Sequence, residues 1–208
     1  MLEARRSLTL LVALLVLTYG GASAALAEDA PSLKDAGVKG PATAGIQPFV
    51  GKLNGFEFYD VSKAPLEDPN ACAADDRREL RAEELRRTGL DFVPTYLPRG
   101  ARLDFAGGQA CPDAVLIIQK DYLLEYGDLL TIAYVQAPRR IPGTQPRSQL
   151  RAVHLRSRQA VLTRSLSEFN SGELHMSDGT GSTGYYYISG IELPERELLK
   201  IGRGIVKR

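Results

Sequence analysis

Residues that commonly build metal centres are scarce in this sequence. It contains only two cysteines and two histidines, and Cys72, Cys111, His154 and His175 are too widely separated to give the paired ligand spacings of a zinc site. No other motif implies a bound group. We therefore predict neither a metal nor any other cofactor.

A complete set of catalytic residues is also lacking. His154 or His175 could be combined with Ser165 or Ser177 and with Asp178 as base, nucleophile and orienting acid. However, no serine stands in the glycine-flanked turn that exposes a hydrolase nucleophile. The simpler interpretation places these polar side chains on exposed faces of strands. The sequence thus predicts no catalytic residue and a protein that is not an enzyme, with a small secreted hydrolase as the third alternative for its function.

Only one long uncharged run occurs, and it lies at the amino terminus. Two arginines precede an apolar stretch over residues 8–19, and the sequence Ala-Leu-Ala before Glu28 fits a signal-peptidase site. This pattern predicts a signal peptide over residues 1–27 and an extracytoplasmic protein, either periplasmic or secreted. Because residues 7–27 carry no charge and are just long enough to span a bilayer, an uncleaved amino-terminal helix that anchors the chain is the alternative.

An excess of either charge is missing once the signal peptide is removed. The 26 bases and 25 acids of the whole sequence become 24 of each without Glu3, Arg5 and Arg6. A neutral chain has no overall attraction to the phosphate backbone of nucleic acid. Nucleic acid is therefore not an expected partner.

Removal of the signal peptide leaves 181 of the 208 residues, which suits one domain. Residues 28–48 are rich in alanine, glycine and proline and are predicted to form a flexible spacer, so the single domain extends over residues 49–208. An even number of cysteines in an exported chain favours a disulfide between Cys72 and Cys111, which would contribute roughly 4 kcal/mol. Two buried free thiols are the alternative.

Alternating apolar residues predict a mostly antiparallel sheet. Residues 122–137 have the pattern of two strands joined by a two-residue Gly-Asp turn, and Asn54-Gly55 within residues 49–61 is a second hairpin signal. Each hairpin pairs its own strands antiparallel. Further strands are expected over residues 90–96, 101–105, 114–119, 150–156, 159–165, 173–177 and 184–191.

Two helices complete the expected fold. Residues 75–88 contain helix formers throughout, with acids first and arginines last. Pro194 suits the start of a second helix, in which Leu198, Ile201 and Ile205 lie on one face. That apolar stripe needs a sheet to cover, so we expect an α+β fold: an antiparallel β-sheet with a carboxy-terminal helix packed on one face.

The order of three motifs resembles a known bacterial module. The turn LPRG at residues 97–100 is followed by YLLEYGDLLTIAYVQAP from Tyr122 and by GYYYISGIELPERELLKIGRGI from Gly184. This order is similar to the carboxy-terminal domain of RseB/MucB-type periplasmic regulators of sigma factors, and to the related uncharacterised domain of anti-sigma factors and sporulation proteins. The resemblance covers residues 92–206. It implies a role in sigma-factor or envelope-stress regulation, with an anti-sigma factor as partner.

Arginines without neighbouring acids form the most uneven charge distribution. Residues 129–167 contain no acid, and arginine favours bidentate contacts with carboxylates and phosphates. Arg156 and Arg158 share one face of a strand if no bulge intervenes. The alternative is a set of solvated arginines paired with the acids of residues 75–88. The candidate binding residues are Arg139, Arg140, Arg147, Arg156 and Arg158.

These observations favour a non-catalytic sensory or interaction module of the cell envelope. Its expected partner is an envelope protein or an anionic amphiphile, and a membrane surface is a further candidate. A periplasmic carrier that binds an amphiphile or lipid between the sheet and the helix is the alternative function. A flat basic face favours the interaction module, whereas an exposed apolar groove favours the carrier.

Overall fold

A computed structural model describes the fold of residues 47–60, 62–63, 76–164, 172–179 and 184–207. All of the secondary structure in these ranges belongs to one compact unit that runs from Ile46 to Arg208. The predicted signal peptide and most of the predicted spacer lie outside the described residues. Cys111 is described, and its N–H donates to the carbonyl of Ala114 at 2.7 Å. Because Cys72 is outside the described residues, the disulfide between the two cysteines stays a prediction.

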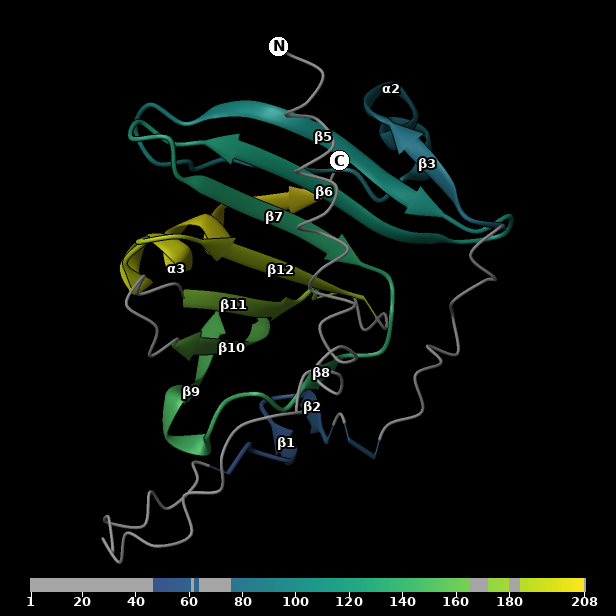
Figure 1. Cartoon of the computed structure of the whole chain (residues 1–208). Helices are drawn as coiled ribbons and strands as arrows, with labels where there is room; N and C mark the ends of the chain where they lie inside the picture. The colour runs from purple at the N-terminus through teal and green to yellow at the C-terminus, as the bar shows by residue number, and fades with distance from the viewer. Residues whose placement is uncertain (1–46, 61, 64–75, 165–171, 180–183, 208) are drawn as a thin grey trace, which may run out of the picture. The chain divides into compact units, whose positions relative to one another are not determined.

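The largest element is an eight-stranded sheet (Figure 1). Its strand order is β3-β5-β6-β7-β12-β11-β10-β9, and every neighbouring pair is antiparallel. The predicted antiparallel sheet is therefore confirmed, and the four strands expected from residue 150 onward are found within one residue of their predicted bounds. The strands are β3 (Arg78–Arg81), β5 (Arg102–Ala110), β6 (Val115–Leu123), β7 (Leu129–Val135), β9 (Leu150–Leu155), β10 (Arg158–Arg164), β11 (Gly172–Ser177) and β12 (Tyr185–Gly190).

Two smaller sheets accompany the large one. β1 (Gly51–Leu53) and β2 (Phe56–Tyr59) form an antiparallel hairpin, and β8 (Arg140–Pro142) pairs with β2 in parallel. The Asn-Gly turn predicts this hairpin, whereas β8 is missed because residues 138–149 have the proline and arginine content of a loop. The other small sheet consists of β4 (Phe92–Pro94) and β13 (Ile205–Lys207).

The helices are shorter than the sequence predicts. The helix expected over residues 75–88 is wrong in its first part, because Arg78–Arg81 is a strand paired with β5. Leu80 is 3% exposed there and lies opposite Gly108, so burial of Leu80 and the ladder hydrogen bonds outweigh helix propensities of about 0.7 kcal/mol per residue or less. The helical segments are α2 (Ala82–Leu85), η2 (Arg86–Thr88), η3 (Arg147–Gln149) and α3 (Glu195–Gly204).

The central hairpin differs from its prediction in strand length and in turn. Residues 114–119 do not form a separate strand, since β6 continues to Leu123. The two-residue turn is also wrong: Leu123 pairs with Leu129, and within the loop between them the Gly127 N–H donates to the Leu124 carbonyl at 3.0 Å. Gly127 has a φ of 87°, which glycine adopts without steric cost. Gly127 therefore lies near the end of the loop over residues 124–128, and not at the first position of a two-residue turn.

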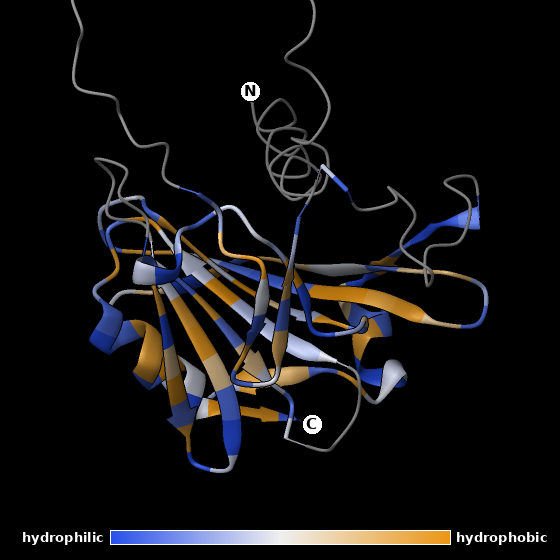
Figure 2. Ribbon diagram, turned by 90° about the horizontal axis from the view of Figure 1, so that it is seen from below, coloured by the Kyte–Doolittle hydropathy of each residue, from blue (hydrophilic) through white to orange (hydrophobic). Residues whose placement is uncertain are grey.

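The main core gathers alternate residues of neighbouring strands. Ile132 and Leu174 are 0% exposed, and Figure 2 shows apolar and polar residues following one another along several strands. Leu198 and Ile201 of α3 are also 0% exposed and belong to the same cluster. A Cβ atom at Gly202 would lie 2.8 Å from Cδ2 of Leu174. The helix near the carboxy terminus therefore shares a core with β11.

Candidate functional site

The small sheet β1-β2-β8 is held against the large sheet by its hairpin turn. Asn54 and Gly55 both have positive φ, 48° and 82°, as in the type I′ turn that this dipeptide favours. The side-chain amide of Asn54 donates to the carbonyls of Val153 in β9 and Ala160 in β10, at 2.8 and 2.7 Å. Each of these bonds contributes on the order of 1 kcal/mol. The turn thus fixes the hairpin over two strands of the large sheet.

One face of the small sheet is apolar and buried. Phe56, Phe58 and Ile141 are no more than 6% exposed, and they form a second core cluster with Leu150 and Val161 of the large sheet. Side chains alternate between the two faces of a strand. The residues between these apolar side chains therefore lie on the outer face of the small sheet.

The outer face carries a row of three charged residues. Lys52 lies opposite Glu57, and Glu57 lies beside Arg140 in the strand register. The Nε atom of Arg140 is 3.6 Å from Oε1 of Glu57, and its guanidinium carbon is 5.0 Å from the centroid of the Tyr59 ring. The side chains of Arg140 and Glu57 are 43% and 46% exposed. Solvent therefore reaches a row whose arginine is oriented by an aromatic ring.

A shallow cleft of about 410 Å³ opens on the small sheet. Lys63 and Asp60, 3.3 Å apart, contribute to its lining, and hydrogen bonds from Ser62 lower the pKa of Asp60 and keep it ionised. The two segments that build the small sheet, residues 47–63 and 136–149, contain five bases and two acids, and one of the bases, Arg139, faces Asp178 outside these segments. The local charge is therefore positive, although the chain without its signal peptide is neutral. The cleft is lined by Val50, Gly51, Lys52, Glu57, Phe58, Tyr59, Asp60, Lys63 and Arg140.

Two of the five arginines predicted to bind a partner lie on or beside this sheet. Arg140 belongs to β8, and Arg147 follows it in η3. Nη1 of Arg147 donates to the carbonyl of Leu150 at 2.7 Å, and its guanidinium carbon lies 5.6 Å from the centroid of the Phe49 ring. Both guanidiniums thus lie over an aromatic ring, and both residues are exposed. Their binding role stays a prediction.

The other three predicted arginines lie elsewhere. Arg139 is 3.7 Å from the buried carboxylate of Asp178, and Nη1 of Arg158 donates to the carbonyl of Ile205 at 3.2 Å. Arg156 is exposed in the turn between β9 and β10, with a φ of 58°. The expectation that Arg156 and Arg158 share a strand face is wrong, because this turn separates them. The structure therefore divides the five arginines among several elements.

Sequence reasoning missed the other charged and aromatic residues of the cleft. Lys52 and Glu57 stand at equal distances from the Asn-Gly turn, so a two-residue hairpin places them opposite each other. That spacing was a usable signal. Arg140 could not be added to the row from the sequence, because its strand is distant along the chain and pairs with β2 in parallel.

A second polar cluster lies on β11, where the two sheets meet. His175 is 6% exposed, its ring packs against those of Phe56 and Tyr187, and neither of its ring nitrogens forms a hydrogen bond. Nε2 of His175 is 3.5 Å from Oε2 of Glu173. Burial raises the pKa of Glu173, but His175 and the hydroxyls of Tyr187 and Thr163 outweigh burial and lower it. One ionised carboxylate is therefore held beside the junction of the sheets.

The histidines, the serines and the acid that could have formed a catalytic triad are spread over several elements, and the hydroxyl of Ser177 accepts the Gln159 N–H at 3.1 Å. His154 is exposed on β9 and His175 is buried on β11, with β10 between these strands. Asp178 is buried beside Arg139, and Ser165 lies outside the described residues. Within the described ranges, no group of three or more His, Cys, Asp or Glu side chains is placed to hold a metal ion.

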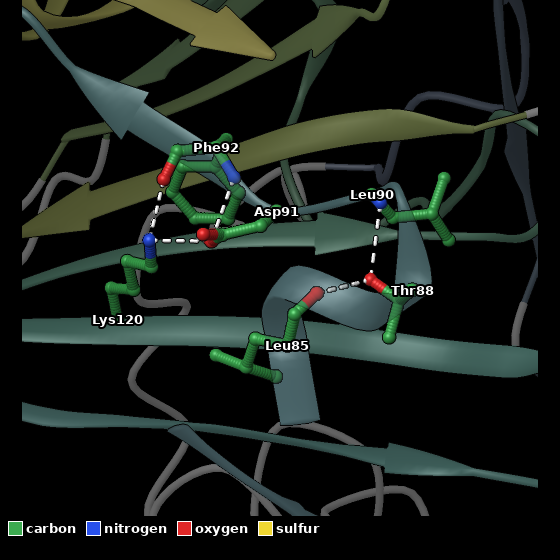
Figure 3. A network of polar contacts seen from close by, with 6 residues as sticks. All are labelled: Leu85, Thr88, Leu90, Asp91, Phe92 and Lys120. Carbon is green, nitrogen blue, oxygen red and sulfur yellow. Dashed lines mark hydrogen bonds and ion pairs between the residues drawn. The ribbon is translucent and has the colours of Figure 1, made fainter. Parts of the chain in front are cut away.

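Figure 3 shows a buried ion pair between β6 and the residue that precedes β4. Nζ of Lys120 is 2.6 Å from Oδ1 of Asp91 and donates to the carbonyl of Phe92 at 2.5 Å. The same Asp91 oxygen accepts the Phe92 N–H at 2.9 Å, and nearby the hydroxyl of Thr88 donates to the carbonyl of Leu85. Lys120 and Asp91 are no more than 9% exposed. Their contacts lie inside the fold, so we assign the pair a structural role.

Two buried tyrosines predict how the domain responds to alkali. Burial raises the pKa of Tyr122 and of Tyr186 to about 12. Because the unfolded value is about 10, their stabilising effect is complete below about pH 10 and is lost as the pH rises through about 12. We expect the free energy of unfolding to fall less steeply over this range in a Tyr122→Phe/Tyr186→Phe variant than in the parent. Phenolate absorbance and denaturant titrations measure both effects, and an equal fall in the two proteins would contradict the prediction.

No helix among the residues described is long and apolar enough to cross a membrane. The chain matches no family model, no curated protein and no solved structure.

Proposed function

We propose that this chain is a non-catalytic interaction module of the cell envelope, and that it binds an acidic partner through the outer face of its small sheet. The observation that carries the proposal is the pair of exposed guanidiniums, Arg140 and Arg147, held over Tyr59 and Phe49. Arg140 belongs to β8 of the small sheet, and Arg147 lies beside the sheet in η3. The segments that build this region contain five bases and two acids. Such a surface suits a partner that presents carboxylates.

Aromatic support makes arginine effective in this role. A guanidinium stacked on a ring is already oriented, so less side-chain freedom is lost when it binds a carboxylate. A positive surface on a neutral chain also raises the rate of association with an acidic partner. Because charges at this surface are screened over about 8 Å at physiological ionic strength, binding should weaken as salt is added.

The location and the biological role in this proposal come from the sequence. The predicted signal peptide supports a location outside the cytoplasm, and the resemblance of residues 92–206 to RseB/MucB-type regulators supports a role in sigma-factor or envelope-stress regulation. An anti-sigma factor is then the candidate partner. We also propose that α3 covers one face of the large sheet, as expected from the apolar stripe of the carboxy-terminal helix.

The close contact of α3 with the sheet supports an interaction module over an amphiphile carrier. A carrier that binds an amphiphile between α3 and the large sheet needs room for it there. A Cβ atom at Gly202 would lie 2.8 Å from Leu174 and 2.9 Å from Leu155, and Leu198 and Ile201 are fully buried. Side chains therefore fill the contact of α3 with β9 and β11 around Gly202. A cleft beside α3 lies at its start, where polar side chains contribute to its lining, those of Thr163, Arg164, Glu195 and Arg196.

Replacing Arg140 and Arg147 together by glutamine is expected to weaken binding to poly-L-glutamate roughly tenfold at low salt, because each exposed charge contact contributes about 0.5–1 kcal/mol. The matched control is Arg86→Gln/Arg87→Gln, which removes two exposed arginines from η2. It should change the affinity less than about twofold. Fluorescence anisotropy of labelled poly-L-glutamate at low and high salt measures the affinities, and thermal melts verify that both variants fold.

Parent-like affinity in the Arg140→Gln/Arg147→Gln variant would refute the proposal. A loss of the same size in the control variant would also refute it, since the effect would then follow net charge and not this surface. A difference from the parent that does not shrink at high salt would show that the arginines act by something other than charge.

A further inference from the structure

We infer that the acidic partner presents an extended segment with a carboxylate at every third residue, and that two of these carboxylates bind Lys52 and Arg140 on either side of Glu57. The inference rests on the proposed function, because it names the chemistry of the partner for the same face. It follows from the spacing of the row, from the position of Glu57 within it and from the shape of the cleft.

The spacing of the row selects one backbone conformation. Lys52 and Arg140 are one strand away from Glu57 on opposite sides. Neighbouring strands are about 4.8 Å apart, so the backbone positions of the two bases are separated by about 9.6 Å. In a polyproline II segment every third residue points the same way, with a repeat of about 9.3 Å. In a β-strand the repeat on one face is about 6.7 Å. The polyproline II repeat therefore matches the two bases, and the strand repeat does not.

Glu57 occupies the place that a partner carboxylate would take. Its Oε1 atom is 3.6 Å from Nε of Arg140, and Lys52 lies directly opposite it across the hairpin. The side chain of Glu57 is 46% exposed, so a competing carboxylate can reach the same arginine. Glu57 thus orients Arg140 before the partner arrives, and it also competes with the partner for this arginine. Removal of its charge should therefore strengthen binding.

The cleft offers an apolar surface beside the charged row. Val50 is 55% exposed, and the ring of Tyr59 lies under the Arg140 guanidinium within the same lining. Proline-rich segments in the polyproline II conformation dock on aromatic surfaces of this kind, and they lose little conformational entropy in doing so. The residues between the carboxylates of the partner can therefore pack on Tyr59 and Val50.

A membrane surface fits the row less well than a peptide. A lipid phosphate concentrates its charge at one point, whereas the two bases project from backbone positions about 9.6 Å apart across the row. A peptide can also fix the distance between two carboxylates, which independently diffusing lipids do not. The acidic peptide is therefore the occupant we assign, and lipid binding is an outcome that the experiment must distinguish.

The experiment compares two labelled peptides of equal composition, one with three Glu-Pro-Pro repeats and one with the three glutamates adjacent. The parent is expected to bind the repeat peptide at least about fivefold more tightly at low salt. Glu57→Gln should tighten this binding about threefold, and Lys52→Gln should weaken it by a similar factor. Glu79→Gln, which removes an exposed acid from β3, is the matched control and should stay within about twofold of the parent.

Each outcome bears on one of the two proposals. Equal affinity for both peptides, or no gain in Glu57→Gln beyond the Glu79→Gln control, would overturn the inference; the proposed function would still stand if Arg140→Gln/Arg147→Gln loses its affinity for poly-L-glutamate. Tighter binding to phosphatidylglycerol/phosphatidylcholine vesicles than to the repeat peptide would replace the peptide by a lipid surface. Tighter binding by a Glu57→Gln variant that melts like the parent supports the inference directly.

Discussion

Truncation after Leu193 is expected to abolish the cooperative unfolding of the domain. It removes α3 and β13, and with them the side chains of Leu198, Ile201 and Ile205, which are no more than 2% exposed. Full burial of such a side chain contributes about 1.5–3 kcal/mol, and the whole stability of a typical domain is about 5–15 kcal/mol. Calorimetry should therefore show no cooperative transition near the melting temperature of the parent.

A single substitution tests the same contact without shortening the chain. Ile201→Ala removes methylene groups from a site that is 0% exposed, and the free energy of unfolding should fall by about 2–5 kcal/mol. Val206→Ala is the control, because Val206 is 48% exposed in β13, and the change there should stay within about 0.5 kcal/mol. A truncated protein that still melts like the parent, together with an Ile201→Ala variant that matches the control, would show that α3 is an appendage.

The sequence predicts the carboxy-terminal part of the fold well because periodicity and turn chemistry agree there. From residue 150 onward, short apolar runs are separated by polar residues, and the strands that result are close to their predicted bounds. The helix after Pro194 is also found, although it ends at Gly204 and Ile205 begins β13. Local sequence is sufficient to predict an element when the residues that the element buries are the same ones that its apolar pattern indicates.

Prediction fails where pairing with a distant strand decides the structure. Residues 78–81 have high helix propensity and are nevertheless a strand, since β5 offers Gly107 and Gly108 as partners. β8 is short, ends in Pro142 and pairs in parallel with β2. The local sequence of neither segment indicates which strand it pairs with.

The candidate site also has one part that the sequence predicts and one part that depends on a distant strand. Lys52 and Glu57 could be paired from the Asn-Gly turn alone, whereas Arg140 joins them only through the parallel strand β8. The acid-free run that suggested five binding arginines was a real feature of the sequence. It could not show that Arg139 faces Asp178 or that Arg158 reaches the carbonyl of Ile205.

The charged residues within β6 show that the sequence can predict a buried ion pair only in part. A lysine inside a strand needs a partner when it is buried, because an unpaired charge in the core is costly. Lys120 has that partner in Asp91, which precedes a different strand. The need for a partner could be predicted, but its identity depends on how β4 meets β6.

Replacing Lys120 by methionine is expected to destabilise the domain by about 3–5 kcal/mol. Methionine is similar in length and apolar, so loss of volume contributes little. The cost comes chiefly from the carboxylate of Asp91, which is 5% exposed and loses its cation, and from the carbonyl of Phe92, which loses a donor. Equilibrium unfolding in urea measures the change.

The double variant Asp91→Asn/Lys120→Met identifies the source of that loss. Asparagine keeps an oxygen that can accept the Phe92 N–H, which donates to Asp91 at 2.9 Å in the parent, and it carries no charge. We therefore expect the double variant to be more stable than Lys120→Met by about 1–3 kcal/mol, even though it differs from the parent at two sites. Lys63→Met, whose side chain in the parent is 82% exposed, is the control and should unfold like the parent. A double variant no more stable than Lys120→Met would show that the lost bond to Phe92 and the altered packing, and not the unpaired carboxylate, account for the destabilisation.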